Sequence, residues 1–199
     1  DKDEIVRQDA TLESLAQLAP SFQALGESGY DTVATTQYPE VNQVQHLHTP
    51  GNSSGMVDGA SLVLLGNMEK GKEIGLRPRA KILSAVTVSV EPTIMLTGAS
   101  PASKLALEYA GMEAKDIDLW EMNEAFAAPV LKFKRDMDIN PEKLNVNGGG
   151  IALGHPLGAT GAILLNTLLD ELERRDLSTG LVTMCIGGGM GIATIIERI

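Results

Sequence analysis

The sequence predicts a layered α/β protein, in which helices cover both faces of a sheet. The chain has 199 residues, of which 43% are hydrophobic and only 4% aromatic. Its core must therefore be built mainly from Ala, Val, Ile, Leu and Met, as in sheets covered on both faces. From residue 51 onward, segments with strand and helix patterns also alternate, which is typical of layered α/β domains.

Residues 1–50 differ from the rest of the chain and are interpreted as a linker or the remainder of a lid. They are polar and rich in turn-forming residues. Residues 11–22, TLESLAQLAPSF, predict a short helix that Pro20 stops, and residues 26–31, GESGYD, predict a loop. We therefore place the domain boundary near residue 50, so that residues 51–199 form the main domain.

The main domain is expected to alternate helices and strands. Apolar residues at helical spacing predict helices, and runs of β-branched and apolar residues predict strands. Pro101 and Gly111 bound one helix, because proline fits a first turn and glycine ends a helix well. The expected order is helix 54–75, strand 79–90, helix 101–111, strand 116–122, helix 123–137, strand 144–147, helix 158–175, and two strands joined by a glycine turn within 180–199.

Charge and cysteine content exclude several classes of function. The net charge of −10 disfavours binding to nucleic acid or anionic membranes, although a local basic patch could hold an anionic ligand. The apolar runs are too short to span a bilayer. Cys185 is the single cysteine and no signal peptide opens the chain, which predicts a reducing, cytoplasmic setting. Because the chain opens without Met, we expect a piece of a longer protein.

A glycine-rich loop surrounds His155 in the stretch NVNGGGIALGHPLGATGA. Nucleotide binding does not fit it: a dinucleotide fingerprint starting at Gly148 needs glycine where Leu153 stands, and a P-loop needs Gly-Lys-Ser/Thr where Gly-His-Pro stands. Glycine allows close approach of the backbone to a ligand, and Pro156 fixes the turn that aims the imidazole. The alternative is a buried histidine satisfied by backbone groups.

Two further loops carry candidate chemistry. In MCIGGGMG, Cys185 ends a strand and precedes Gly187–Gly189, whose unshielded backbone N–H groups could bind an oxyanion. In EMNEAFAA, Asn123 and Glu124 follow a strand, at the edge where open α/β sheets place active-site groups. The alternatives are a cysteine that acts as a small hydrophobe and an asparagine that caps the next helix. Together, histidine, cysteine and asparagine suit acyl transfer through a thiol or thioester.

His46 and His48 are the remaining histidines. Two residues apart on a strand, they would share a face, so a metal pair is conceivable. No third ligand is evident in the sequence, and we therefore expect no metal site.

Four motifs in order, GNSSGMVDGA, NEAFAA, NVNGGGIALGHPLGATGA and CIGGGMGIA, resemble the motif set of the thiolase family over the whole of residues 1–199. The resemblance implies acyl transfer between coenzyme A and an enzyme cysteine, with cleavage or formation of 3-ketoacyl-CoA and no cofactor beyond the CoA thioester substrate. It also implies two βαβαβαββ halves packed as αβαβα layers. Residues 1–50 would be the tail of an inserted loop domain, and residues 51–199 the C-terminal thiolase domain.

The resemblance also implies roles for single residues. His155 would activate the nucleophile and help to bind the thioester oxygen, and Asn123 would hold the water that completes this oxyanion site. Cys185 would be the acid and base at the α-carbon of the substrate. The backbone N–H of Gly187 would serve a second oxyanion site.

Substrate contacts and the missing nucleophile follow from the same resemblance. Ser54 would contact the pantetheine arm, and Ala125 and Phe126 would line the acyl pocket. The nucleophilic cysteine belongs to the first half of the family's fold and is absent here, so the expected partners are acyl-CoA or CoA, the missing N-terminal half, and further copies in a homodimer or homotetramer. The alternatives are a non-catalytic thiolase-like module that binds acyl-CoA or dimerises, and an unrelated α/β protein with glycine-rich turns.

Overall fold

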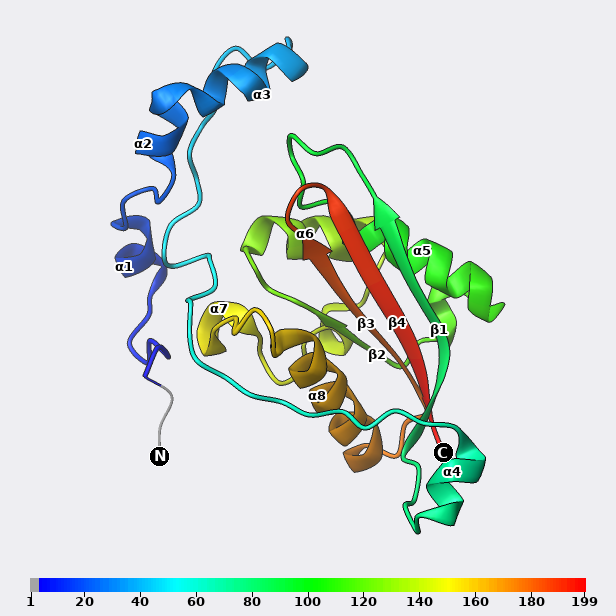
Figure 1. The fold of residues 1–199 in the computed structure, drawn as a ribbon. Helices are drawn as coiled ribbons and strands as arrows, with labels where there is room; N and C mark the ends of the chain where they lie inside the picture. The colour runs from blue at the N-terminus through cyan, green and yellow to red at the C-terminus, as the bar shows by residue number, and fades with distance from the viewer. Residues whose placement is uncertain (1–3) are drawn as a thin grey trace.

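The computed structural model describes residues 4–199 and contains one four-stranded sheet between helices (Figure 1). The strand order is β1-β4-β3-β2, with β2 parallel to β3 and the other neighbours antiparallel. The predicted layered α/β fold is therefore confirmed, as are the strand after residue 79 and the C-terminal pair. The strands are β1 (Ala80–Ser89), β2 (Leu119–Met122), β3 (Thr179–Ile186) and β4 (Met190–Arg198).

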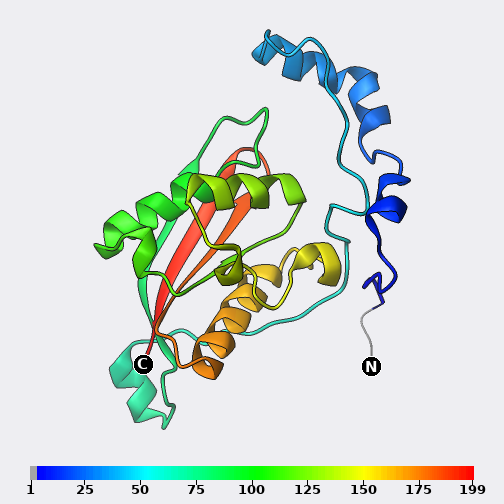
Figure 2. The same cartoon turned by 180° about the vertical axis from the view of Figure 1, so that it is seen from behind.

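Helices cover the two faces of the sheet, as the view from behind also shows (Figure 2). Because successive side chains of a strand point to opposite faces, Trp120 of β2 packs in the core on the side of α5 and α6, while Leu119 packs on the side of α8. The alternation of side chains along the strands therefore gives two apolar layers, one packed on each face of the sheet. The helices are α5 (Ala99–Ala110), α6 (Ala127–Asp136) and α8 (Thr160–Arg174).

The segment before residue 50 forms short helices along one side of the sheet domain (Figure 1). The short helix predicted to begin near residue 11 and to stop at Pro20 is present but ends at Ala16, and Thr11 caps its first turn. The predicted loop at 26–31 is wrong: this stretch is helical, with a kink at Gly29, whose φ of 125° glycine adopts at low cost. The helices are α1 (Leu12–Ala16), α2 (Gln23–Leu25), η1 (Gly26–Tyr30) and α3 (Asp31–Gln37).

The helix predicted over residues 54–75 is largely wrong. Only α4 (Met68–Glu73) forms, because the Asn67 side chain caps it by accepting a hydrogen bond from the Lys70 N–H at 2.8 Å. Residues 54–67, which we call the strap, are not helical and cross α8 as an irregular chain (Figure 1). Asn166 of α8 holds them by donating to the Ser61 hydroxyl at 3.0 Å. Tertiary contact therefore overrides the helical spacing of the strap's apolar residues.

Two segments around the site also differ from prediction: a helix begins later than expected, and a strand is missing. Residues 123–126 are not helical, because a neighbouring chain segment pairs with them: the Ser54 N–H donates to the Ala125 carbonyl at 3.0 Å. The strand predicted at 144–147 does not form, since Asn145 adopts a left-handed φ of 48°. The remaining short elements are η2 (Ala114–Asp116), η3 (Pro141–Lys143) and α7 (Gly150–Leu153).

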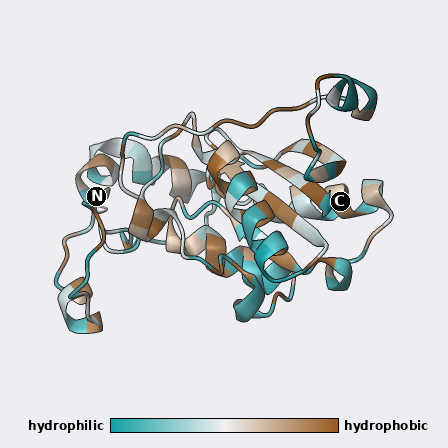
Figure 3. Cartoon of the chain, turned by 90° about the horizontal axis from the view of Figure 1, so that it is seen from below, coloured by the Kyte–Doolittle hydropathy of each residue, from teal (hydrophilic) through white to brown (hydrophobic). Residues whose placement is uncertain are grey.

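Apolar residues also remain on the surface of the strap. Figure 3 shows the chain leading to α4 in the brown of apolar residues, and Leu62, Leu64 and Leu65 are 87%, 73% and 67% exposed. Contiguous exposed apolar residues are a common feature of interaction sites. Within residues 4–199, the structure contains no helix with the length and apolar character needed to cross a membrane.

The layer under α8 can be tested by truncation. Leu168 of α8 is 1% exposed, so Leu168→Ala should leave a cavity and lower the free energy of unfolding by about 3 kcal/mol. Leu131→Ala on α6, where the side chain is 60% exposed, is the matched control and should change it little. Denaturant unfolding followed by the fluorescence of the single, buried Trp120 measures both; equal losses would contradict the assignment of this layer.

Candidate functional site

The site lies at the edge of the sheet where the parallel strands β2 and β3 both end. Met122 pairs with Thr183, and the Asn123 N–H continues the ladder by donating to the Thr183 carbonyl at 3.0 Å. Cys185 follows two residues further along β3. Parallel strands end at the same edge, and this pairing therefore brings two of the predicted site residues to neighbouring strand ends.

His155 contacts Asn123 at this edge. The Asn123 Nδ2 lies 3.3 Å from the His155 Nε2, although the two residues are far apart in the chain. Asn123 is buried, and His155 is half-buried. The interpretation of Asn123 as a helix cap is wrong, because Phe126 stands at the cap position of α6.

Thr160 orients the imidazole and was missed in the sequence. Its Oγ1 lies 2.6 Å from the His155 Nδ1 and donates to the Pro156 carbonyl at 3.1 Å. Because the hydroxyl has a single proton, the Nδ1–H must be the donor to Thr160, which leaves Nε2 as an acceptor facing Asn123. Burial lowers the pKa of His155, so the neutral form is favoured. Side chains rather than backbone groups are therefore the partners of the two ring nitrogens of His155.

Glycine is required where the histidine loop meets its neighbours. Gly154 has a φ of 93°, and a Cβ there would overlap the Val57 side chain of the strap. The His155 N–H also donates to the Gly55 carbonyl at 2.9 Å. The prediction that glycines allow close backbone approach around His155 is confirmed at these positions.

The predicted substrate-contact residues lie together beside the same edge. Ser54 pairs with Ala125 through the backbone, and Ser53 bridges to Phe126. The Phe126 ring packs against His48 with ring centroids 4.8 Å apart. The strap and the loop after β2 therefore form one wall that runs from Asn123 to Phe126.

The two N-terminal histidines have separate partners. The His46 Nε2 lies 3.0 Å from the Asp31 Oδ2, whereas His48 packs against Phe22 and Phe126. Over residues 4–199, no group of three or more His, Cys, Asp or Glu side chains is arranged to hold a metal ion.

Cys185 and Gly187 lie on the neighbouring strand end. Cys185 has the strand parity of Leu181 and Thr183, so its thiol is directed to the face that α5 covers, and it is 8% exposed. Burial raises the pKa of this thiol, which keeps its proton at neutral pH. Gly187 is exposed and opens the turn to β4, in which Gly188 and the buried Gly189 both have a φ of 85°.

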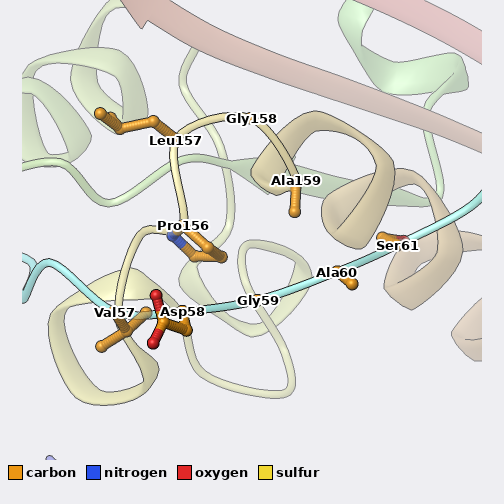
Figure 4. Close-up of a pocket in the computed structure, with 9 residues that line it drawn as sticks. All are labelled: Val57, Asp58, Gly59, Ala60, Ser61, Pro156, Leu157, Gly158 and Ala159. Atoms are coloured by element: carbon orange, nitrogen blue, oxygen red, sulfur yellow. The ribbon is translucent and has the colours of Figure 1, made fainter.

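A shallow hollow lies between the strap and the chain that follows His155 (Figure 4). The ring of Pro156 is directed toward the strap, where a Cβ on Gly59 would lie 2.6 Å from it. Asp58 is the one charged residue of the lining, which comprises residues 57–61 and 156–159. The hollow therefore lies beside the contact of His155 with Asn123 and does not include it.

Glu121 is a buried carboxyl that the sequence did not single out. It shares the strand parity of Asn123, is 1% exposed, and its Oε2 has no hydrogen-bond partner among residues 4–199. Burial, with a contribution from the charge of Glu124, raises the pKa of Glu121 to about 8. A neutral acid in β2 therefore lies two residues before Asn123, which directly follows this strand.

The fold and the site together define a layered α/β protein with a neutral histidine held against an amide at parallel strand ends. The family profile described as "Thiolase, C-terminal domain" matches residues 76–198. The chain thus belongs to the thiolase family, and it carries the family's C-terminal half fold. The motif resemblance seen in the sequence is confirmed.

Individual relatives agree with this assignment. The chain is 46% identical over its full length to a 3-ketoacyl-CoA thiolase of Cronobacter sakazakii and 47% identical to an acetyl-CoA acetyltransferase of Rhizobium meliloti, of which it covers 47% and 46%. Its structure matches the crystal structures of the Bacillus anthracis acetyl-CoA acetyltransferase (TM-score 0.84, 40% identity) and human mitochondrial 3-ketoacyl-CoA thiolase (0.80, 37%). These two matches cover 100% and 98% of this chain, respectively, and 45% of each solved chain. The chain spans about half the length of these relatives.

The buried carboxyl of Glu121 predicts that the free energy of unfolding depends on pH. Because the folded pKa of Glu121, about 8, exceeds the ordinary 4.5, the folded chain holds a proton that the unfolded chain releases. Stability should therefore fall as the pH rises between these values, by about 1.4 kcal/mol per pH unit from this group. Glu121→Gln should remove that slope, whereas exposed Glu108→Gln should keep it. Unfolding measured from about pH 5 to 8 checks this, and parallel curves for wild type and Glu121→Gln would refute it.

Proposed function

We propose that this chain is the acid–base and oxyanion half of a thiolase, which transfers acyl groups between coenzyme A and an enzyme cysteine. The observation that carries the proposal is the neutral His155, whose Nε2 is an acceptor held 3.3 Å from the Asn123 amide. Such an imidazole can accept a thiol proton and then donate toward a developing oxyanion.

In the cleavage direction, His155 takes the proton of a nucleophilic cysteine that the missing N-terminal half supplies. The thiolate attacks the 3-keto carbon, and the bond between that carbon and the α-carbon breaks. The electron pair passes to the α-carbon, which takes a proton from Cys185. A CoA thiol then gives its proton to the Cys185 thiolate and attacks the acylated cysteine. The cysteine leaves as a thiolate and takes its proton back from His155, while CoA carries the acyl group away. Because burial raises the pKa of Cys185 and keeps it protonated, it is suited to donate this proton.

Oxyanion binding and substrate contact use the groups around that edge. His155 and Asn123 stabilise the thioester oxyanion, and the backbone N–H of Gly187 stabilises the enolate oxygen; one well-placed donor contributes about 3 kcal/mol to a transition state. Ser54 contacts the pantetheine arm, and Ala125 and Phe126 line the acyl pocket. The backbone pairing of Ser54 with Ala125 supports this assignment by joining the two contacts.

The missing half is the proposed partner of the strap. The chain covers about half of its relatives, and Leu62, Leu64 and Leu65 are exposed on a segment that belongs to no sheet within residues 4–199. A segment with free backbone groups and apolar side chains can add to the edge of a sheet. Packing of the first half against the strap would bring the nucleophile toward His155, within a homodimer or homotetramer.

A second candidate is a non-catalytic thiolase-like module that binds acyl-CoA or dimerises. The presence of a single cysteine, Cys185, in the sequence favours it. The coding sequence upstream of residue 1 separates the two: a cysteine flanked by small residues at a strand-to-helix turn supports the enzyme. A natural start at Asp1 supports the module.

Two substitutions in the full-length protein separate the proposed chemical roles. His155→Ala should slow acylation of the nucleophile by about 100-fold or more. Cys185→Ser should leave acylation by an activated thioester intact while it stops carbon–carbon cleavage, because the protonated thiol at the α-carbon is lost. Single-turnover acylation and steady-state thiolysis measure the two steps, and wild-type cleavage by the Cys185→Ser variant would show its role to be wrong.

The isolated chain should behave as an unpartnered half. We expect it to bind an apolar dye and to self-associate, because the strap leaves apolar side chains in water. Leu62→Asp with Leu64→Asp should reduce both effects, whereas Leu131→Asp on α6 should not. Sedimentation and dye fluorescence measure them, and a wild-type chain that stays monomeric without dye binding would argue against the missing partner.

A further inference from the structure

We propose that Asn145 and Glu124 are positioning residues, which lock the loop that carries His155 onto the end of β2 and so set the contact of His155 with Asn123. We call the hydrogen bonds of Asn145 and Glu124 the lock, and the catalytic effect that we expect from it rests on the proposed function. The lock itself rests on contacts within the chain, so the lock and the proposed function can be refuted independently of each other.

The Asn145 side chain takes the place of a missing strand. Its Oδ1 accepts a hydrogen bond from the Met122 N–H at 2.8 Å, and its Nδ2 donates to the Met122 carbonyl at 2.9 Å. One carboxamide thus pairs with both backbone groups of a residue at the outer edge of β2, as a neighbouring peptide would. Asn145 tolerates its left-handed φ of 48° better than most residues. This explains why the strand predicted at 144–147 is absent.

Glu124 extends the lock into the glycine-rich loop. The Asn145 Nδ2 also donates to the Glu124 Oε1 at 2.9 Å, and the Glu124 Oε2 accepts from the Ile151 N–H at 3.3 Å. Gly149 makes room for the carboxylate, since a Cβ there would overlap the Glu124 Cδ. The two oxygens of one carboxylate therefore join the end of β2 to the segment that precedes His155.

The lock can restrain the site because it joins residues that are close in the chain to Asn123 and to His155. Glu124 directly follows Asn123, and Ile151 lies about one helical turn before His155 in the chain. The intervening chain contains Gly154 at a positive φ, and glycine restrains a backbone poorly. A shift of about 1 Å between two reacting groups can reduce a rate by about 100-fold. Holding Ile151 against Glu124 thus limits how far His155 can move from Asn123.

Turnover of the full-length protein tests the catalytic consequence. Asn145→Asp replaces the Nδ2 donor by an oxygen that opposes both the Met122 carbonyl and Glu124, so kcat should fall by about 10-fold or more with little change in KM. Glu124→Gln alone should also lower kcat, because its single oxygen cannot accept from both Asn145 and Ile151.

A double variant and a control make this test specific. When Asn145→Asp and Glu124→Gln are combined, the amide introduced at position 124 can donate to the carboxylate introduced at position 145, and part of the lost kcat should be recovered. Asn140→Asp, in an exposed cap of η3, is the matched control and should leave kcat unchanged. Losses that simply add in the double variant would contradict a direct contact between the two side chains.

The imidazole itself gives a readout that does not depend on turnover. The chain has three histidines, so His46 and His48 serve as internal references in an NMR titration of this chain. Releasing the loop should expose His155 and move its titration midpoint upward, toward the ordinary value, in Asn145→Asp and Glu124→Gln. Unchanged His155 titration and unchanged kcat in these two folded variants would overturn the proposal. A shifted His155 in this chain, together with a full-length protein that catalyses no acyl transfer, would retain the lock and refute the proposed function.

Discussion

The site depends above all on the parallel pairing of β2 with β3. Both strands are covered on their faces, so polar groups can reach a ligand at the strand ends, and parallel strands share an end. The Asn123 N–H, by pairing with the Thr183 carbonyl, extends the ladder past the last residue of β2. The loop that carries His155 packs against this edge, and the carboxamide of Asn145 joins the loop to β2.

Burial sets the charge state of this edge. It lowers the pKa of His155 and raises the pKa values of Cys185 and Glu121, so these three titratable groups are all favoured in their neutral forms. The formal net charge of −10, which counts every Asp and Glu as ionised, is therefore carried almost entirely by residues outside this edge. In the proposed function, His155 as a neutral base and Cys185 as a neutral acid would exchange protons with the substrate without a buried ion in the resting state.

Segments whose structure is set by local residue patterns could be predicted from the sequence. Segments and side chains whose structure is set by contacts with distant residues could not. The β-branched runs indicated β1, β3 and β4, and the glycines around His155 marked a close approach that the structure contains. The strap was predicted wrongly because its apolar residues have helical spacing, whereas α8 and the site loop hold this segment in a non-helical form. Asn145, Thr160 and Glu121 carried no sequence pattern, because an amide that replaces a strand, a hydroxyl that fixes a tautomer and an unpaired acid are defined by tertiary neighbours.

The proposed division of labour between two halves rests on which contacts are internal to this chain. The bonds that orient His155, through Thr160, Asn123 and the lock of Glu124 with Asn145, all lie within this chain. The contact of His155 with Asn123, which we propose to be the base and its oxyanion partner, therefore forms without a second chain. Preorganised donors act without reorganisation at the moment of reaction. A first half would then need to supply a thiol within reach of the His155 Nε2 and a sheet edge for the strap. The strap contacts the His155 loop at Gly55, so a partner that docked on the strap would be coupled by a few residues to the position of His155.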